Sequence, residues 1–377
     1  MSATHPFWQP HKYHPMNYFT SLRKLSACLF LVFAPVAHAQ WQAKAVFLTD
    51  ARLAVLKERV AQKQEPTWSA WQKVQKMANE GLSLKVEVPE NWYVPGAYKD
   101  PEGCGRANRP LDVSTKTSYY LALAYRITGD EKYAQAAVNL IRPWCVGIKS
   151  YSKADDSTLS FSYHIPAMIA AADLLKNSPS FTKPDQELFR RFVREQALPM
   201  NCMARKNNWG NWGLLLVMTS AAYLDDEKLF NKGIQRWKEL LETQQDDSGV
   251  LSEEVGRSEG KMGLWYTNFC LFPQTLCAEV ARVNNVDLFD YTSPTGRSLR
   301  KAYERAIPWQ IDPASFPYYK GNPKDLVGVT HIPHFELLVP RWPNPDASAL
   351  LRKVRPIYTH YGIPGETFTH GDIPVDL

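Results

Sequence analysis

A helical hairpin that occurs twice limits the folds open to this chain more than any other feature. The first copy, LALAYRITGDEKYAQAAVNLIRPW, spans residues 121–144, and the second, TSAAYLDDEKLFNKGIQRWKELL, spans residues 219–241. Each has an Ala-Tyr pair, a short acidic turn with Asp-Glu-Lys and then a second amphipathic helix. Because one helix pair cannot bury its apolar face alone, repeated pairs stack on one another. The chain is therefore predicted to be built from stacked helical hairpins.

Apolar residues recur at i, i+3, i+4 and i+7 through most of the chain, whereas strand-like alternation is scarce. This spacing predicts helices at residues 114–128, 131–144, 162–176, 185–204, 211–224, 227–245, 264–283 and 295–306. Stacked hairpins form an open solenoid or a closed ring. Irregular loops between the pairs favour the ring, an all-α fold called an (α/α) toroid, or incomplete (α/α) barrel. After about residue 307, frequent prolines predict an irregular C-terminal segment that seals the ring, with one helix at residues 345–354.

Residues 1–39 have the features of a signal peptide. Arg23 and Lys24 precede an apolar run that is too short to span a bilayer, and an Ala-His-Ala sequence ends at residue 39. We expect the mature chain to begin near Gln40 and to be periplasmic or secreted, with no membrane attachment. Residues 40–377 contain no linker-like composition, so we expect a single domain and a monomer.

Charge and metal-ligand patterns exclude two classes of protein. Without residues 1–39 the chain has 41 basic and 38 acidic residues, a mild excess that predicts no nucleic-acid binding but allows a positive cleft for an acidic ligand. The cysteine spacing fits no zinc pattern, and Cys270 and Cys277 are predicted to be single buried thiols. His331-x-x-His334 is not the H-E-x-x-H pattern of a zinc site. We expect no metal and no cofactor.

A first polar cluster, NNWGNW, begins a strongly apolar helix at residues 207–212. One asparagine can cap that helix, and indole rings often pack in a core. Two further amides exceed what one cap requires, and helix N-termini attract carboxylates through their free N–H groups. We therefore predict a role in substrate binding or catalysis for five of these residues: Asn207, Asn208, Trp209, Asn211 and Trp212.

A second polar cluster, LSEEVGRSEGKMGLWYTNFCLF, spans residues 251–272. It places Glu254 and Arg257 in a glycine-containing loop, and Trp265 and Tyr266 in the first turn of the helix that follows. A tyrosine at such a position is often part of the core. The arginine, the carboxylate and the aromatic-rich loop just upstream favour a chemical role for Tyr266 instead. Trp265, like Trp209, could stack on a sugar ring.

The two clusters, their order and their separation of about fifty residues resemble the alginate lyase superfamily of polysaccharide lyases. In that family an Asn-Asn-His-Ser-Tyr-Trp motif is followed by a charged loop with an arginine and by a helix carrying Tyr-His-Asn-Tyr-Ala-Leu. This chain has Asn-Asn-Trp-Gly-Asn-Trp at residues 207–212 and Tyr-Thr-Asn-Phe-Cys-Leu at residues 266–271. Further similarity runs through residues 119–144, 165–175 and 335–344.

The resemblance implies cleavage of an acidic polysaccharide, alginate or a related 4-linked uronate polymer, by β-elimination. That reaction removes the C5 proton beside the sugar carboxylate and expels the 4-linked oxygen. Asn208 and Arg257, with Glu254 in its protonated form, would stabilise the charge that develops on the carboxylate. Tyr266 would act first as base and then as acid, and Arg257 would lower the tyrosine pKa.

Two positions depart from the family pattern. Trp209 stands where the family has a histidine, and Glu259 occupies the position of the family arginine, which makes Arg257 the nearest candidate and Lys261 the alternative. When the proton and the leaving oxygen lie on opposite sides of the ring, a second base is needed. His164, expected just before a helix that begins near Pro166, is the substitute. The alternative for this histidine is a structural role, capping the helix or bonding a backbone carbonyl.

Two other functions stay open. A glycoside hydrolase acting on unsaturated uronyl oligosaccharides would need two carboxylic acids across a cleft, for which Asp155-Asp156 and Asp246-Asp247 are candidates. A non-catalytic polysaccharide-binding toroid would fit the tryptophan at position 209. An assay for unsaturated products separates these functions from a lyase.

Overall fold

Four long, largely buried helices form the inner layer of the protein. In the computed structural model, which describes residues 41–375, each of these helices packs against the next one in chain order. They are α3 (Pro101–Thr128), α6 (Ser157–Leu175), α8 (Asn208–Leu224) and α11 (Gly263–Val283). Small and aliphatic residues make α6 and α8 apolar on almost every side, which is typical of a fully buried helix.

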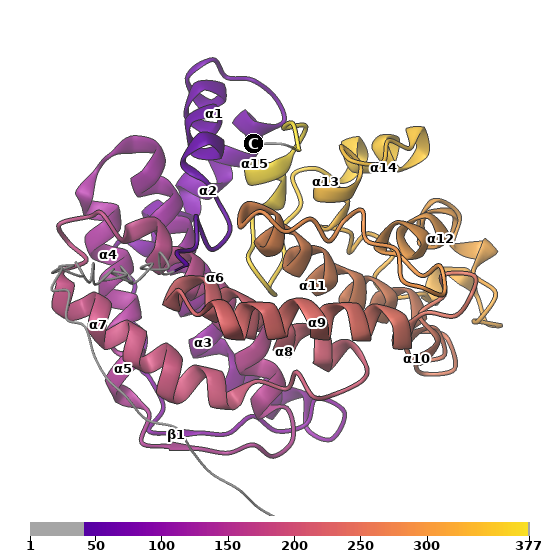
Figure 1. Ribbon diagram of the computed structural model, residues 1–377, viewed down its shortest axis with the longest axis horizontal. Helices are drawn as coiled ribbons and strands as arrows, with labels where there is room; N and C mark the ends of the chain where they lie inside the picture. The colour runs from indigo at the N-terminus through magenta and orange to yellow at the C-terminus, as the bar shows by residue number, and fades with distance from the viewer. Residues whose placement is uncertain (1–40, 376–377) are drawn as a thin grey trace, which may run out of the picture. The chain divides into compact units, whose positions relative to one another are not determined.

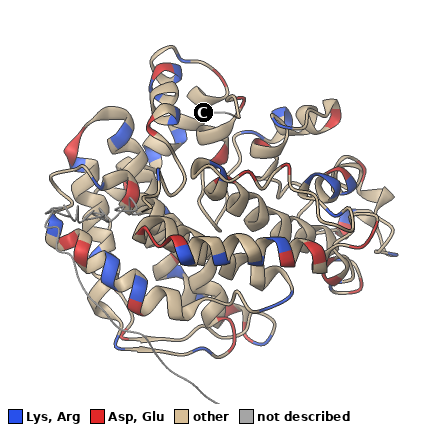
Figure 2. Ribbon diagram, in the orientation of Figure 1, with Lys and Arg blue, Asp and Glu red and all other residues tan. Residues whose placement is uncertain are grey.

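A second set of helices covers the outside of this layer (Figure 1). Helices α2 (Thr67–Gly81) and α4 (Glu131–Ile141) pack against α3, α9 (Glu227–Gln244) packs against α8, and α12 (Leu299–Ile311) packs against α11. Figure 2 shows many charged residues along α9 and other outer elements and few along the inner helices. The outer helices are thus amphipathic, and the inner-and-outer pairing confirms the predicted (α/α) toroid.

The remaining elements are mostly short. They are α1 (Asp50–Ala61), β1 (Asn91–Trp92), α5 (Trp144–Gly147), β2 (Ser150–Tyr151), α7 (Lys183–Phe192), a π-helix (Val193–Ala197), α10 (Ser252–Val255), α13 (Phe335–Leu338), α14 (Pro345–Val354), α15 (Glu366–His370) and 3₁₀ turns at Leu198–Met200, Pro313–Ser315 and Pro323–Asp325. The two strands pair in parallel.

Several helix boundaries differ from the prediction. Helix α3 begins at Pro101 rather than Ser114, because Asp100 caps it and the helix accommodates Pro110 in its interior. Helix α6 begins at Ser157, so residue 164 lies within the helix and not before it. The predicted helix at 185–204 ends at Phe192 and continues as π and 3₁₀ turns. Helices α1 and α2 were not predicted.

The C-terminal segment closes the ring against its first helices. Helix α15 packs against α1 and α2, with the Phe368 and Trp71 ring centroids 5.6 Å apart. Figure 1 shows this yellow end of the chain beside the indigo helices. The helix predicted at 345–354 is confirmed as α14. Arg355 connects two parts of this segment, Glu336 on α13 and Asp372 after α15. It donates to the buried Glu336 from Nη2 at 2.6 Å and to Asp372 from Nη1 at 2.8 Å.

The sequence also led to expectations about the cysteines, membrane attachment, metal binding and the signal peptide. Cys270 and Cys277 are buried free thiols, as predicted. Among residues 41–375, no helix is both long and apolar enough to cross a membrane. Within the same residues, no three His, Cys, Asp or Glu side chains gather as a metal site would require. The predicted signal peptide lies outside the described residues.

We predict that Arg355→Met lowers the free energy of unfolding by about 3–5 kcal/mol, because it leaves the fully buried Glu336 carboxylate without its charged partner. Chemical denaturation of the purified chain measures this change. Arg352→Met is the matched control, since Arg352 is exposed on the same segment. Equal stability of the two variants would contradict the importance of the Arg355–Glu336 pair.

Candidate active site

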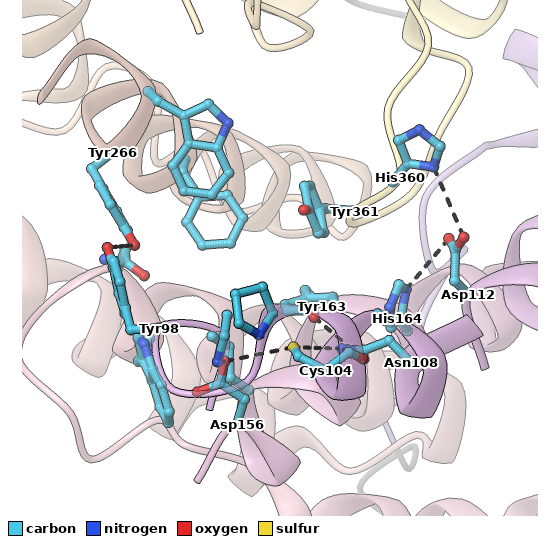
Figure 3. Close-up of a pocket in the computed structure, with 18 of the residues that line it drawn as sticks. Tyr98, Cys104, Asn108, Asp112, Asp156, Tyr163, His164, Tyr266, His360 and Tyr361 are labelled. Carbon is cyan, nitrogen blue, oxygen red and sulfur yellow. Dashed lines mark hydrogen bonds and ion pairs between the residues drawn. The ribbon is translucent and has the colours of Figure 1, made fainter. Parts of the chain in front are cut away.

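A cavity of about 800 Å³ opens at the N-terminal ends of the four inner helices (Figure 3). The loop before α3 contributes Tyr98, and the C-terminal segment contributes His360 and Tyr361. Helix N-termini carry a partial positive charge, and the wall has three arginines, Arg109, Arg205 and Arg257, against two aspartates, Asp112 and Asp156. The cavity therefore favours an anionic ligand.

Tyr266 lies in the first turn of α11 and its side chain lines the cavity. Its hydroxyl is hydrogen-bonded to the hydroxyl of Tyr98, as Figure 3 shows, and the Arg257 Cζ atom lies 4.7 Å from the centroid of its ring. Burial, followed by the Tyr98 hydrogen bond, raises the pKa of Tyr266 well above its ordinary value. Arg257 opposes this rise but does not overcome it, which corrects the expectation of a lowered pKa.

Arg257 is held by a strained turn between α10 and α11. The two residues after it, Ser258 and Glu259, have φ of 51° and 55°, in the left-handed region that non-glycine residues rarely occupy. Gly260 follows at φ 88°, where a Cβ atom would lie 2.0 Å from the Tyr318 carbonyl oxygen. Arg257, just before this turn, lines the cavity. Glu259, the residue seven before Tyr266, is part of the turn itself.

Asn208 joins the two sequence clusters. It is the first residue of α8, fully buried, and its backbone N–H donates to Glu254 Oε1 at 2.8 Å. Its side-chain Nδ2 lies 3.0 and 2.9 Å from the two Glu254 oxygens. Asn207 caps the helix by accepting from the Trp209 N–H, and it also lines the cavity.

Asn211 and Trp212 lie beneath the cavity wall. The Asn211 amide donates to Gln244 Oε1 at 2.9 Å and faces the Cys270 sulfur, also at 2.9 Å. The Trp212 side chain is fully buried and packs against Phe269. Both were predicted to contact substrate, but neither lines the cavity. Their position one turn into the buried helix gives them packing roles.

Two tryptophans do face the cavity. Trp209 is half-buried, and the Arg205 guanidinium lies 5.5 Å from its ring centroid. Trp265 stacks on Phe269, with ring centroids 4.4 Å apart and an interplanar angle of 19°. These rings provide apolar surface beside the charged groups.

His164 lies across the cavity from Tyr266, in a separate group with Asp112 and His360 (Figure 3). Its side chain is 4% exposed, and its Nδ1 lies 3.9 Å from an Asp112 oxygen. Burial lowers the pKa of His164 to about 3, although Asp112 opposes this effect. Lys116 donates to Asp112 at 3.1 Å and contacts His360. His164 is therefore neutral and a weak base.

The sequence reasoning missed Tyr98, Asn108 and Tyr361, all of which line the cavity. Tyr98 follows a Pro-Gly turn and is 70% exposed, and an aromatic side chain on such a loop is a recognisable sign of a binding role. Tyr361 lies in the C-terminal segment, where no helical pattern indicates which side chains turn inward. Only the folded chain brings it beside α6.

Comparison with known proteins agrees with this architecture. An alginate lyase from Pseudomonas syringae pv. tomato is 29% identical over 134 residues, which cover 36% of this chain and 34% of that protein. The match thus spans about a third of the curated relative's length. An alginate lyase structure from Bacteroides ovatus matches with a TM-score of 0.66 at 20% identity, over 85% of this chain and 98% of that chain.

A variant of alginate lyase A1-III complexed with a tetrasaccharide matches with a TM-score of 0.68 at 19% identity, over 87% of this chain and 95% of that chain. At such identities the two structures show the shared toroid fold. The profile of the Alginate lyase family matches residues 59–316, well over half of the sequence. The chain therefore belongs to the alginate lyase family.

Proposed function

We propose that this protein is a polysaccharide lyase that cleaves a 4-linked uronate polymer, alginate or a glucuronan-type polymer, by β-elimination. One observation carries the proposal: the phenol of Tyr266 lies in an anion-favouring cavity with the Arg257 guanidinium 4.7 Å from its ring. A proton-transfer group thus adjoins a carboxylate-binding group. The lyase names of the related proteins support the same reaction class.

The first requirement of the reaction is to weaken the negative charge of the sugar carboxylate. The C5 proton becomes acidic only when charge developing on the carboxylate is stabilised by preorganised donors. Asn208, whose side chain is buried, and Arg257, which is partly exposed, both belong to the cavity wall, and we infer that their N–H groups donate to one carboxylate. They hold the substrate with C5 facing Tyr266.

The second requirement is proton transfer at Tyr266. In its phenolate form Tyr266 takes the C5 proton; the C–H electron pair forms the C4=C5 double bond, and the C4–O bond breaks. The phenol then returns that proton to the leaving oxygen, so the enzyme ends unchanged. Arg257 favours the phenolate, whereas burial and Tyr98 favour the phenol. Tyr266 is therefore a phenol in this structure, and it must release that proton before it can take the proton on C5.

A tyrosine acting alone restricts the substrate. His164 is buried and neutral on the other side of the cavity, which argues against its use as a second base. With one group for both transfers, the C5 proton and the 4-linked oxygen must lie on the same face of the sugar ring. Mannuronate and glucuronate have this arrangement, and guluronate, inverted at C5, does not.

The hydrolase alternative finds less support. Asp155 is bound by Tyr93 and Lys99, and Asp246 accepts hydrogen bonds within its own turn. Asp247 is exposed beside Arg297. Of the four candidate carboxylates only Asp156 lines the cavity, and hydrolysis would require a partner across it.

We predict that Tyr266→Phe abolishes formation of unsaturated products while leaving the fold intact, because the variant loses only the hydroxyl that transfers the proton. Ultraviolet absorbance of the new C=C bond conjugated to the carboxylate measures the reaction, and circular dichroism checks the fold. Tyr318→Phe, a change at a partly exposed tyrosine outside the cavity, is the control. Near-normal turnover by Tyr266→Phe would contradict the proposed proton transfer by the Tyr266 hydroxyl.

We also predict a substrate order. Polymannuronate or glucuronan should give a faster rise in absorbance than polyguluronate, because only the first two present the proton and leaving oxygen to the same side. Purified polymers are compared at equal uronate concentration. Preferred cleavage of polyguluronate would show that a second base exists. Oligosaccharide binding without any cleavage would favour the non-catalytic alternative.

A further inference from the structure

Glu254 is the point at which the two polar clusters meet. Its side chain is 1% exposed at the end of α10 and does not line the cavity. It accepts from the Asn208 backbone N–H and side-chain Nδ2, and the Arg257 Nε atom lies 3.5 Å from its Oε2. Glu254 was predicted to contact the substrate itself. In the structure it instead contacts Asn208 and Arg257, which both belong to the cavity wall.

The hydrogen bonds to Glu254 fix the orientation of the Asn208 amide. Two oxygens of one carboxylate lie too close together to accept separate hydrogens from one nitrogen, so a single N–H is shared between them. The second Nδ2–H remains available. The contact also sets which end of the amide faces Glu254, because the Asn208 oxygen would repel a carboxylate. That Asn208 oxygen has no hydrogen-bond partner among the described residues.

The same carboxylate orients Arg257. Its Nε atom is the guanidinium nitrogen that approaches Glu254, which leaves the two terminal nitrogens for a planar, bidentate contact with another carboxylate. The guanidinium also lies over the Tyr266 ring. Glu254 thus acts on both carboxylate-binding groups and, through Arg257, on the tyrosine.

We propose that ionised Glu254 is the positioning residue of the active site, turning the free Asn208 N–H and the Arg257 terminal nitrogens toward one substrate carboxylate. The inference rests on the proposed lyase function and deepens it. Its physical logic is preorganisation: donors held in place by a buried neighbour stabilise developing charge without rearranging during the reaction.

The contacts around Glu254 suit an ionised carboxylate, because the groups that approach its oxygens are all donors: the Asn208 backbone N–H, the Asn208 Nδ2 and the Arg257 guanidinium. Burial raises the pKa of Glu254, and the exposed Glu253 adds to this, whereas the Asn208 hydrogen bonds and Arg257 lower it. Tyr266 and Cys270, on α11, are the other titratable groups that face it, and burial keeps both protonated. Protonation removes the negative charge and turns one of the two acceptor oxygens into a donor. Activity should therefore fall as the pH is lowered, beginning at a higher pH than that at which an exposed glutamate titrates.

The test compares Glu254→Gln, Glu254→Asp and the control Glu253→Gln, an equivalent charge removal at an exposed neighbour on α10. For Glu254→Gln we expect kcat to fall by about tenfold to a hundredfold with a smaller change in KM, because transition-state stabilisation is lost. Glu254→Asp, which keeps the charge, should retain more activity. Combining Glu254→Gln with Asn208→Ala should lose less than the product of the single losses.

The outcomes separate this inference from the proposed function. If the wild-type protein forms no unsaturated product from any uronate polymer, the lyase assignment fails and this inference fails with it. If wild type is active but Glu254→Gln matches Glu253→Gln in kcat, only the positioning role is overturned. Equal losses for Gln and Asp would also overturn it. Support comes from a kcat loss in the folded Gln variant that is accompanied by disappearance of the acid limb of the pH profile.

Discussion

The contact between Asn208 and Glu254 joins the start of α8 to the segment that carries Arg257, and both parts contribute residues to the cavity wall. It connects the first residue of a buried inner helix to a short helix that precedes a strained turn. Since Glu254 is buried, its oxygens require hydrogen-bond donors, and Asn208 supplies them from its side chain and from its backbone N–H, which has no partner within α8. This contact holds α10 and the turn that follows Arg257, and α11, which carries Tyr266, begins directly after that turn. The same buried contact thus supports the local fold and the arrangement of donors that we propose for catalysis.

The toroid explains why such a site forms at one end of the molecule. Four inner helices run in the same direction, so their N-termini and the loops before them gather around one cavity. The outer helices return the chain and present their charged faces to solvent. The C-terminal segment completes the ring and also lines the cavity with Tyr361. The cavity wall thus combines helix N-termini and arginines with aromatic faces, which suits the acidic polysaccharide that we propose as substrate.

Sequence patterns predicted most of the helices but less of the site. The apolar spacing predicted both ends of α9 and α11 to within one residue, but it began α8 at Asn211 instead of Asn208. The pattern failed at α3, where Pro110 interrupts it although Asp100 caps the true start. Asn208, Arg257 and Tyr266 line the cavity as motif reasoning expected. Trp212 shows the limit of that reasoning, because composition cannot tell which side of a helix entrance faces the core.

The central claim is that cleavage occurs by elimination, and the mass of the products tests it most directly. Elimination leaves a sugar at the new non-reducing end that is lighter by one water than the product of hydrolysis. We expect mass spectrometry of oligosaccharides released from polymannuronate or glucuronan by the wild-type protein to show the lighter series as the main products, with the heavier mass limited to the one fragment per chain that keeps the original non-reducing end. Accumulation of the heavier series without the lighter one would contradict a lyase and identify a hydrolase.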